Sequence, residues 1–121
     1  MIDSWAWIEY FNGSEVGRSM EKYFGNEKVI VSSINIAEVF RHLLAKKGLS
    51  QAEDAASYML GVSFMVPMGA RIAVEAAKIK HQKKWGLGDS IVLATALEHK
   101  ATVVTGDSDF KSEANVVYLG K

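Results

Sequence analysis

Acidic side chains stand where predicted secondary structure begins or ends. Asp3 follows two apolar residues, Asp107 and Asp109 follow an apolar, β-branched run, and Glu38 and Asp89 lie early in two predicted helices. Carboxylates that gather at one place repel one another, so keeping them ionised requires a compensating cation. Mg²⁺ and Mn²⁺ prefer such oxygen ligands, and two such ions roughly 3.5–4 Å apart can hold the attacking water and the leaving oxygen of a phosphodiester. The acids therefore raise the hypothesis of a metal-dependent phosphodiesterase site.

Each acid also has a purely structural interpretation. Asp3 and Asp89 could be N-caps of the helices that follow them, because Asp is among the best N-cap residues. Glu38 could pair with a basic residue three or four positions further along its own helix. The two acids near the C-terminus could be ordinary turn residues after a glycine. Taken singly, each acid fits the structural interpretation better, and only their grouping at strand ends favours catalysis.

The elements that would position the acids are predicted from the hydrophobic pattern. Apolar residues that recur every three or four positions predict a helix over 34–47 that ends near Gly48. Ser50 and Glu53 form a capping-box pattern at the start of the next helix. Gly88 is expected to interrupt the helical pattern before the helix predicted over 90–100. The predicted helices span 5–11, 15–24, 34–47, 50–60, 70–85 and 90–100. The predicted strands span 28–32, 64–68, 101–105 and 116–119, with Met1 and Ile2 as the stub of a further strand.

Strands that alternate with helices predict an α/β fold, specifically a three-layer α/β/α sandwich with a mainly parallel central sheet, formed by residues 1–121 as a single domain. Ligands of such sheets bind at the carboxyl ends of the strands. Asp3, Glu38, Asp107 and Asp109 are expected at that edge. Asp89 is not placed there by the pattern, because a helix that precedes a strand ordinarily begins at the opposite edge.

Composition excludes several kinds of site. The 121 residues include no cysteine, which excludes a thiol nucleophile and any cysteine-ligated metal. Lysine plus arginine equals aspartate plus glutamate at 14 each, so an overall basic surface for nucleic acid is absent. No leader peptide and no apolar run of about 20 residues is visible. We therefore expect a cytoplasmic protein without a membrane segment.

Four segments, in order, resemble the motifs of the PIN-domain family, which includes the VapC toxins of toxin–antitoxin pairs. They are IDSWAWIEYF, with Asp3 and the hydroxyl residue Ser4; VIVSSINIAEVFRHL, with Glu38; GLGDSIVLATAL, with Asp89; and VVTGDSDF, with Thr105, Asp107, Asp109 and Phe110. The resemblance covers nearly the whole chain. It departs from the family at the start, where only two residues precede the first acid.

The resemblance implies an α/β/α sandwich in which the acids, Asp89 included, converge at one edge of a parallel sheet. It implies an Mg²⁺- or Mn²⁺-dependent ribonuclease, a possible antitoxin partner and a homodimer. The metal-binding acids would be Asp3, Glu38, Asp89 and Asp107, with Asp109 as an auxiliary acid. The hydroxyls of Ser4 and Thr105 would orient carboxylates or water.

A basic cluster precedes Asp89 and offers candidate RNA contacts. Lys80, Lys83 and Lys84 could bind phosphates, as could Arg41 beside Glu38, and Trp85 could stack on a base. The alternative is a solvated helix end whose lysines interact with the helix dipole.

Two other function classes remain open. One is a phosphatase or phosphoryl-accepting domain that uses an aspartate nucleophile, which the Asp107-Ser108-Asp109 segment resembles in part. The other is a catalytically inert binding module with the same fold.

Overall fold

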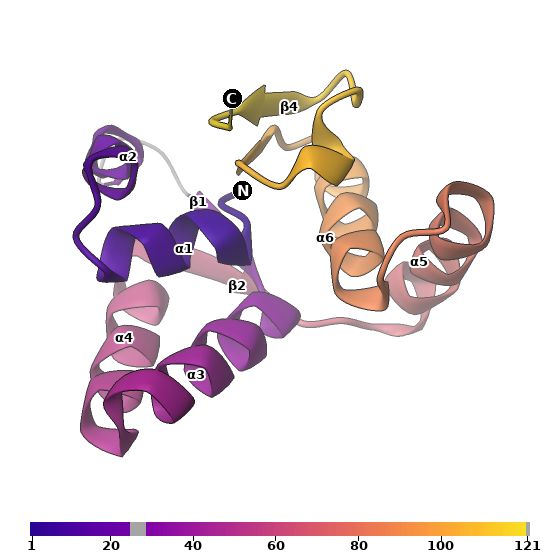
Figure 1. The fold of residues 1–121 in the computed structure, drawn as a ribbon. Helices are drawn as coiled ribbons and strands as arrows, with labels where there is room; N and C mark the ends of the chain where they lie inside the picture. Colours follow the sequence, from indigo (N-terminus) through magenta and orange to yellow (C-terminus); the bar gives the residue numbers. More distant parts are fainter. Residues whose placement is uncertain (25–28, 121) are drawn as a thin grey trace.

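The computed structural model describes residues 1–24 and 29–120. Its strands form two parallel pairs. β1 (Val29–Ser32) pairs with β2 (Ser63–Val66), and β3 (Val103–Thr105) pairs with β4 (Val116–Tyr118). The expected strand at 28–32 is confirmed from Val29 onward, and its first residue, Lys28, lies outside the described residues. The fold is therefore helix-rich α/β with parallel strands (Figure 1).

Helices account for most of the described chain. They are α1 (Ser4–Phe11), α2 (Glu15–Arg18), η1 (Ser19–Tyr23), α3 (Ser33–Lys47), α4 (Leu49–Val62), α5 (Ala70–Lys83), α6 (Leu87–Glu98) and η2 (Ser108–Phe110). In Figure 1, α3 and α4 pack against each other on one side of the molecule, and α5 and α6 pack against each other on the other side. None of the described helices combines the length and the apolar character that a membrane crossing requires.

The N-terminal residues lie along β3 as the expected strand stub. The Asp3 amide donates to the Val104 carbonyl at 2.9 Å, and the Val104 amide donates to the Met1 carbonyl at 2.8 Å. Ile2 forms a parallel bridge with Val104. Because neighbouring side chains of a strand point to opposite faces, Met1 enters the core around α5 and α6 while Ile2 enters the core around α1, α3 and α4. The stub thus joins the two halves of the hydrophobic interior.

The capping box lies at a different helix from the one predicted. The Ile34 amide donates to the Ser32 hydroxyl, and the Ser32 amide donates to the Asn35 side chain, which caps α3 reciprocally. The helix ends at Gly48, whose φ of 97° favours glycine. The next helix, α4, begins directly at Leu49, so Ser50 is already helical and its predicted capping role is wrong.

The start of α6 also differs from the prediction. The helix begins at Leu87 with Gly86 as its N-cap, so Gly88 lies inside the first turn instead of stopping the chain. A Cβ at Gly88 would collide with the Glu38 carboxylate. Glycine at this position leaves room for the Glu38 carboxylate between α3 and α6, a long-range contact that a local pattern does not report.

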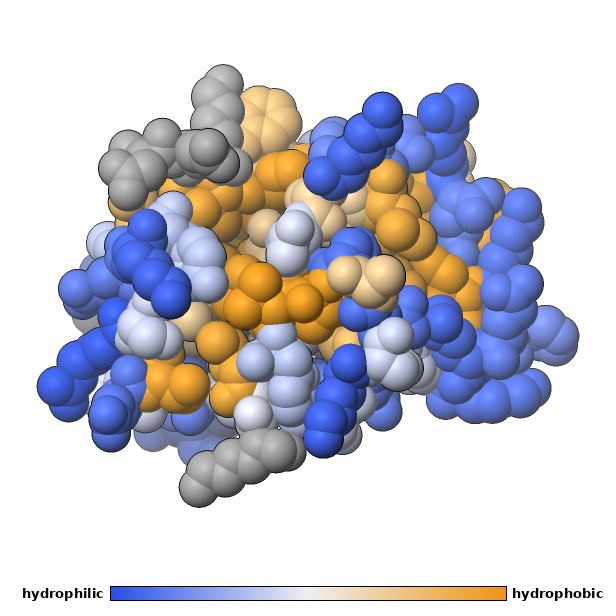
Figure 2. Space-filling model, turned by 90° about the horizontal axis from the view of Figure 1, so that it is seen from above, coloured by the Kyte–Doolittle hydropathy of each residue, from blue (hydrophilic) through white to orange (hydrophobic). Residues whose placement is uncertain are grey.

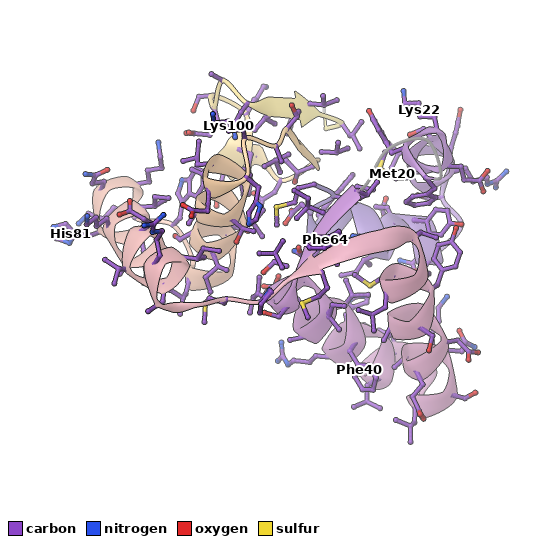
Figure 3. The ribbon with its side chains drawn as sticks, turned by 180° about the vertical axis from the view of Figure 1, so that it is seen from behind. Met20, Lys22, Phe40, Phe64, His81 and Lys100 are labelled. Atoms are coloured by element: carbon purple, nitrogen blue, oxygen red, sulfur yellow. The ribbon has the colours of Figure 1, made fainter. Side chains whose placement is uncertain are left out.

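One face of the molecule is apolar at its centre. Seen from above, an apolar area is surrounded by hydrophilic residues (Figure 2). A cavity of about 560 Å³ lies among Met1, Ile30 and Val117, with Lys100 at its wall, and none of the candidate acids lines it. From behind, Phe64 is seen on β2, and His81 projects outward from α5 (Figure 3). This cavity is therefore separate from the cavity that the candidate acids line.

Candidate metal centre

Three of the predicted acids converge although they come from distant parts of the chain. Asp3, Asp89 and Asp107 each offer a carboxylate oxygen, and these oxygens all lie within 4.8 Å of one another. Asp3 ends the N-terminal stub, Asp107 follows β3, and Asp89 lies in the first turn of α6. They line a cavity of about 660 Å³ whose wall also includes Glu38. The cluster lies at the carboxyl ends of the strands, where ligands of parallel sheets bind.

The structure brings Asp89 to this edge, which the hydrophobic pattern alone did not predict. The first turns of α3 and α6 face each other near the centre of the view (Figure 1). Asp89 is the third residue of α6, where unpaired backbone amides and the positive end of the helix dipole favour a negative charge. The helix start therefore offsets part of the repulsion that the clustered carboxylates impose.

Burial and mutual repulsion make the cluster electrostatically unfavourable without a cation. Asp3 is 3 % exposed, and burial, together with the nearby charges of Glu38 and Asp107, raises its pKa to about 6 even though Thr105 donates a hydrogen bond to it. Burial and then repulsion from Asp107 and Asp3 raise the pKa of Asp89 to about 8. Such pKa values show that the site favours added positive charge, either as protons or as a cation.

The carboxylate set fits a hard divalent cation. All the ligand atoms that converge are carboxylate oxygens, which Mg²⁺ and Mn²⁺ prefer over nitrogen or sulfur donors. The described part of the chain places neither Glu38 nor Asp109 within this closest group. Glu38 lies at the cavity wall beside it, and Asp109 is exposed but close enough to raise the pKa of Asp89.

Thr105 orients two of the acids. Its hydroxyl donates to Oδ2 of Asp3 at 2.8 Å and accepts from the amide of Asp107 at 3.0 Å. Oδ1 of Asp107 in turn accepts from the amide of Asp109 at 2.9 Å, which caps η2. One buried hydroxyl therefore ties the first acid of the chain to the loop that carries the last two.

Ser4 orients Glu38 through a chain of buried hydrogen bonds. Its hydroxyl donates to Oε1 of Glu38 at 2.7 Å and accepts from the side-chain amide of Asn35 at 3.0 Å. The side-chain oxygen Oδ1 of Asn35 accepts from the Ser32 backbone amide at 3.0 Å. Asn35 is fully buried, and our sequence analysis missed it. The signal was present, because an asparagine three residues before Glu38 interrupts the apolar side of the predicted helix.

Most of the predicted RNA contacts in the basic cluster have partners within the protein. Trp85 is 9 % exposed and packs on Phe110 with ring centroids 4.8 Å apart, so it cannot stack on a base and that prediction is wrong. Lys80 donates to the Trp85 carbonyl, and Lys83 forms an ion pair with Glu113 at 2.8 Å. Trp85 anchors the C-terminal segment to the core, and its lysine neighbours stabilise that packing.

Two further candidates for RNA contacts remain exposed. Lys84 caps α5 in the left-handed region, with a φ of 61°, and Arg41 lines the cavity beside the acids.

Comparisons with known proteins agree with this architecture. The family model described as the PIN domain matches residues 1–115. No curated protein sequence matches the chain significantly.

Three solved structures share the fold at low sequence identity. A toxin–antitoxin complex from Klebsiella pneumoniae matches with a TM-score of 0.78 and 22 % identity, over 96 % of this chain and 93 % of that one. VapC20 of Mycobacterium tuberculosis, a toxin described as cleaving the sarcin–ricin loop, matches with a TM-score of 0.80 and 17 % identity, over 95 % of both chains. VapBC2 of Rickettsia felis, bound to a DNA fragment from its promoter, matches with a TM-score of 0.78 and 18 % identity, over 100 % of this chain and 97 % of that one.

Proposed function

Because this chain belongs to the PIN-domain family, we propose that it is a metal-dependent endoribonuclease and the toxin of a toxin–antitoxin pair. The observation that carries the proposal is the convergence of Asp3, Asp89 and Asp107 within 4.8 Å. Ordinary capping or turn roles would not require three acids from distant segments to meet in one cavity.

We assign the metal ligands to Asp3, Asp89 and Asp107, with Glu38 as a further ligand and Asp109 as an auxiliary acid. When bound there, Mg²⁺ or Mn²⁺ would supply a Lewis acid that polarises the phosphodiester and makes water a stronger nucleophile. Thr105 holds Asp3 in one orientation, and Ser4 does the same for Glu38. A carboxylate that is already held in one orientation loses less rotational freedom when it binds a metal ion. The supporting hydrogen bonds therefore favour metal binding.

The assignment of substrate and partners rests on the family and its structural relatives. One relative is described as a loop-cleaving toxin, and two were solved as toxin–antitoxin assemblies. We therefore propose an RNA substrate, an antitoxin partner, a homodimer and a cytoplasmic location for this chain. Arg41 is the RNA contact that we retain next to the acids, with Lys84 as a more distant one.

Cleavage of labelled RNA by the purified protein in Mn²⁺ tests the proposal. Asp89→Asn keeps the size of the side chain but removes a ligand charge, and we expect it to lower cleavage at least ~100-fold. The matched control is Asp54→Asn on the exposed face of α4, which should cleave like the wild type. Undiminished cleavage by Asp89→Asn would refute the metal site.

The two alternative function classes give different results. An inert binding module would show no heat of Mn²⁺ binding in calorimetry and no cleavage of any RNA. A phosphoryl-accepting domain would form a phosphoryl-aspartate with a small phosphodonor such as acetyl phosphate, whereas a hydrolytic nuclease would not.

A further inference from the structure

We propose that Trp5 binds the substrate by stacking on one unpaired base beside the scissile linkage. This inference rests on the proposed ribonuclease function and names the form of RNA that the site accepts. Nothing in the chemistry of the acids requires an aromatic residue, so Trp5 would serve recognition rather than hydrolysis.

The three tryptophans differ in their surroundings, and Trp5 alone of them lines the acidic cavity. Trp7 is fully buried and stacks between Phe11 and Phe24, with ring centroids 5.8 and 5.3 Å away. Trp85 is buried against Phe110. Trp5 is partly buried because one part of it packs against the core around α1, α3 and α4, and no aromatic ring in the described part of the chain stacks on its indole. The part of Trp5 that lines the cavity is therefore available to a ligand that enters it.

The indole lines the same cavity as Asp3 and Asp107 and contacts the residue before Asp107. Trp5 follows Asp3 by two residues, and its ring lies over Gly106, the residue before Asp107. A Cβ at Gly106 would collide with the six-membered part of the indole, so glycine at this position makes room for the ring. A base on the Trp5 ring would thus lie next to a phosphate at the acids.

The same cavity continues along α3 past basic side chains. Arg41 and Lys46 of α3 both line it, and neither forms an ion pair with an acid among the described residues. Unpaired cations beside an aromatic ring are the features that bind single-stranded nucleic acid, because the ring holds a base and the cations hold the backbone. The cavity volume of about 660 Å³ is within the range of pockets that enclose small ligands.

Stacking on Trp5 requires that the RNA is unpaired at this point. Bases inside a duplex are covered on both faces by their neighbours, whereas bases in loops and single strands can turn outward onto aromatic side chains. The site should therefore cleave unpaired strands or loops and spare the same sequence in a duplex.

The binding test uses a short fluorescein-labelled, mixed-sequence oligoribonucleotide and the full chain carrying Asp89→Asn, so that binding is measured without cleavage. Adding Trp5→Leu, which keeps apolar volume but lacks an aromatic face, should weaken binding about 5- to 100-fold. Adding Trp5→Phe should retain most of the affinity. Lys78→Ala, on α5 and paired with Glu75, is the surface control. Equal affinity of the Trp5→Leu and Trp5→Phe proteins for the RNA would overturn the inference.

Abasic substitutions locate the contact and separate this inference from the proposed function. These experiments use Asp89 in its natural form and Mn²⁺, so that RNA can be cleaved. An RNA that lacks the base next to the cleaved linkage should be cleaved more slowly by the natural chain. The same abasic RNA should reduce cleavage by the Trp5→Leu protein little further. Additive defects at every position would overturn the stacking contact while leaving the nuclease intact. If the protein cleaves no RNA but its affinity for RNA still depends on an aromatic residue at Trp5, the nuclease proposal fails and the proposed binding site stands. Thermal unfolding of each variant shows whether a loss reflects folding. If Trp5→Leu is unfolded, the natural chain decides the question, because equal cleavage of intact RNA and of RNA that is abasic next to the cleaved linkage would overturn the stacking contact.

Discussion

Asp3 and Asp89 bind protons more tightly in the folded protein than in the unfolded chain. Their pKa values rise from 3.8 to about 6 and about 8, with burial as the first cause for both. Their contribution to stability is complete below about pH 4 and is lost as the pH rises through 6 and 8, and Asp3 alone accounts for about 3 kcal/mol. The metal-free protein should therefore lose stability mainly between about pH 4 and pH 6, where both acids contribute to the loss. Between about pH 6 and pH 8 the Met1 amino group, whose pKa burial lowers from 8.0 to about 6, contributes about as much stability as Asp89 loses, so stability should change little there.

Calorimetric unfolding in EDTA across this pH range measures the effect. Asp89→Asn should flatten the decline, because the amide cannot ionise. Mn²⁺ should reverse the decline, since metal binds the deprotonated carboxylates and its affinity rises with pH. A melting temperature that rises steadily with pH in EDTA would contradict the electrostatic description of the site.

The candidate residues could be predicted from the sequence to different degrees. The acids and the hydroxyls of Ser4 and Thr105 stood in recognisable local patterns. Asn35 was missed because its role depends on a contact with Ser4, which lies 31 residues away in sequence. Trp85 was misjudged because its burial depends on Phe110, and a local pattern cannot tell a buried aromatic residue from an exposed one.

At the scale of elements, α6 approaches α3 at Gly88, which has no side chain to displace Glu38. Gly88→Ala should favour the helix by up to about 1 kcal/mol, but its Cβ would displace the Glu38 carboxylate from Ser4. We expect stability within about 1 kcal/mol of the wild type and cleavage reduced about 10- to 100-fold. Urea unfolding and RNA cleavage in Mn²⁺ measure the two effects.

Gly61→Ala is the matched control for this prediction. Gly61 is also helical, in α4, but a Cβ there would meet open space. This variant should keep full activity and gain stability. If Gly88→Ala cleaves RNA as fast as Gly61→Ala, the orientation of Glu38 is unimportant for the reaction.

Most elements were predictable because their hydrophobic periodicity is local, while their ends were less so. The helix at α3 and its end at Gly48 followed from apolar spacing and glycine. The sequence pattern predicts later starts for α4 and α6 than the structure has, since their N-caps, Gly48 and Gly86, have no side chain that could mark the helix start. The strand pairs and their register follow from long-range packing, so the sequence predicted parallel strands but not two separate pairs.

For the whole molecule, stability depends on the N-terminal stub that joins the two cores. Ile2 is 1 % exposed and packs among side chains of α1, α3 and α4. Ile2→Ala should cost about 2–4 kcal/mol of unfolding free energy, measured by urea denaturation. Val74→Ala, at an exposed position on α5, should change it by less than about 0.5 kcal/mol. A cost below about 1 kcal/mol for Ile2→Ala would mean that the stub is peripheral.

The hydrogen bond between Thr105 and Asp3 spans 102 positions of the chain. During translation, Asp3 leaves the ribosome 102 residues ahead of Thr105, and Asp107 follows Thr105. A growing polypeptide that stops before β3 has a first acid without its orienting hydroxyl and lacks the third acid altogether. The acidic cluster therefore cannot assemble until β3 and the loop after it have been synthesised, so under the proposed function a chain that stops before β3 should not cleave RNA.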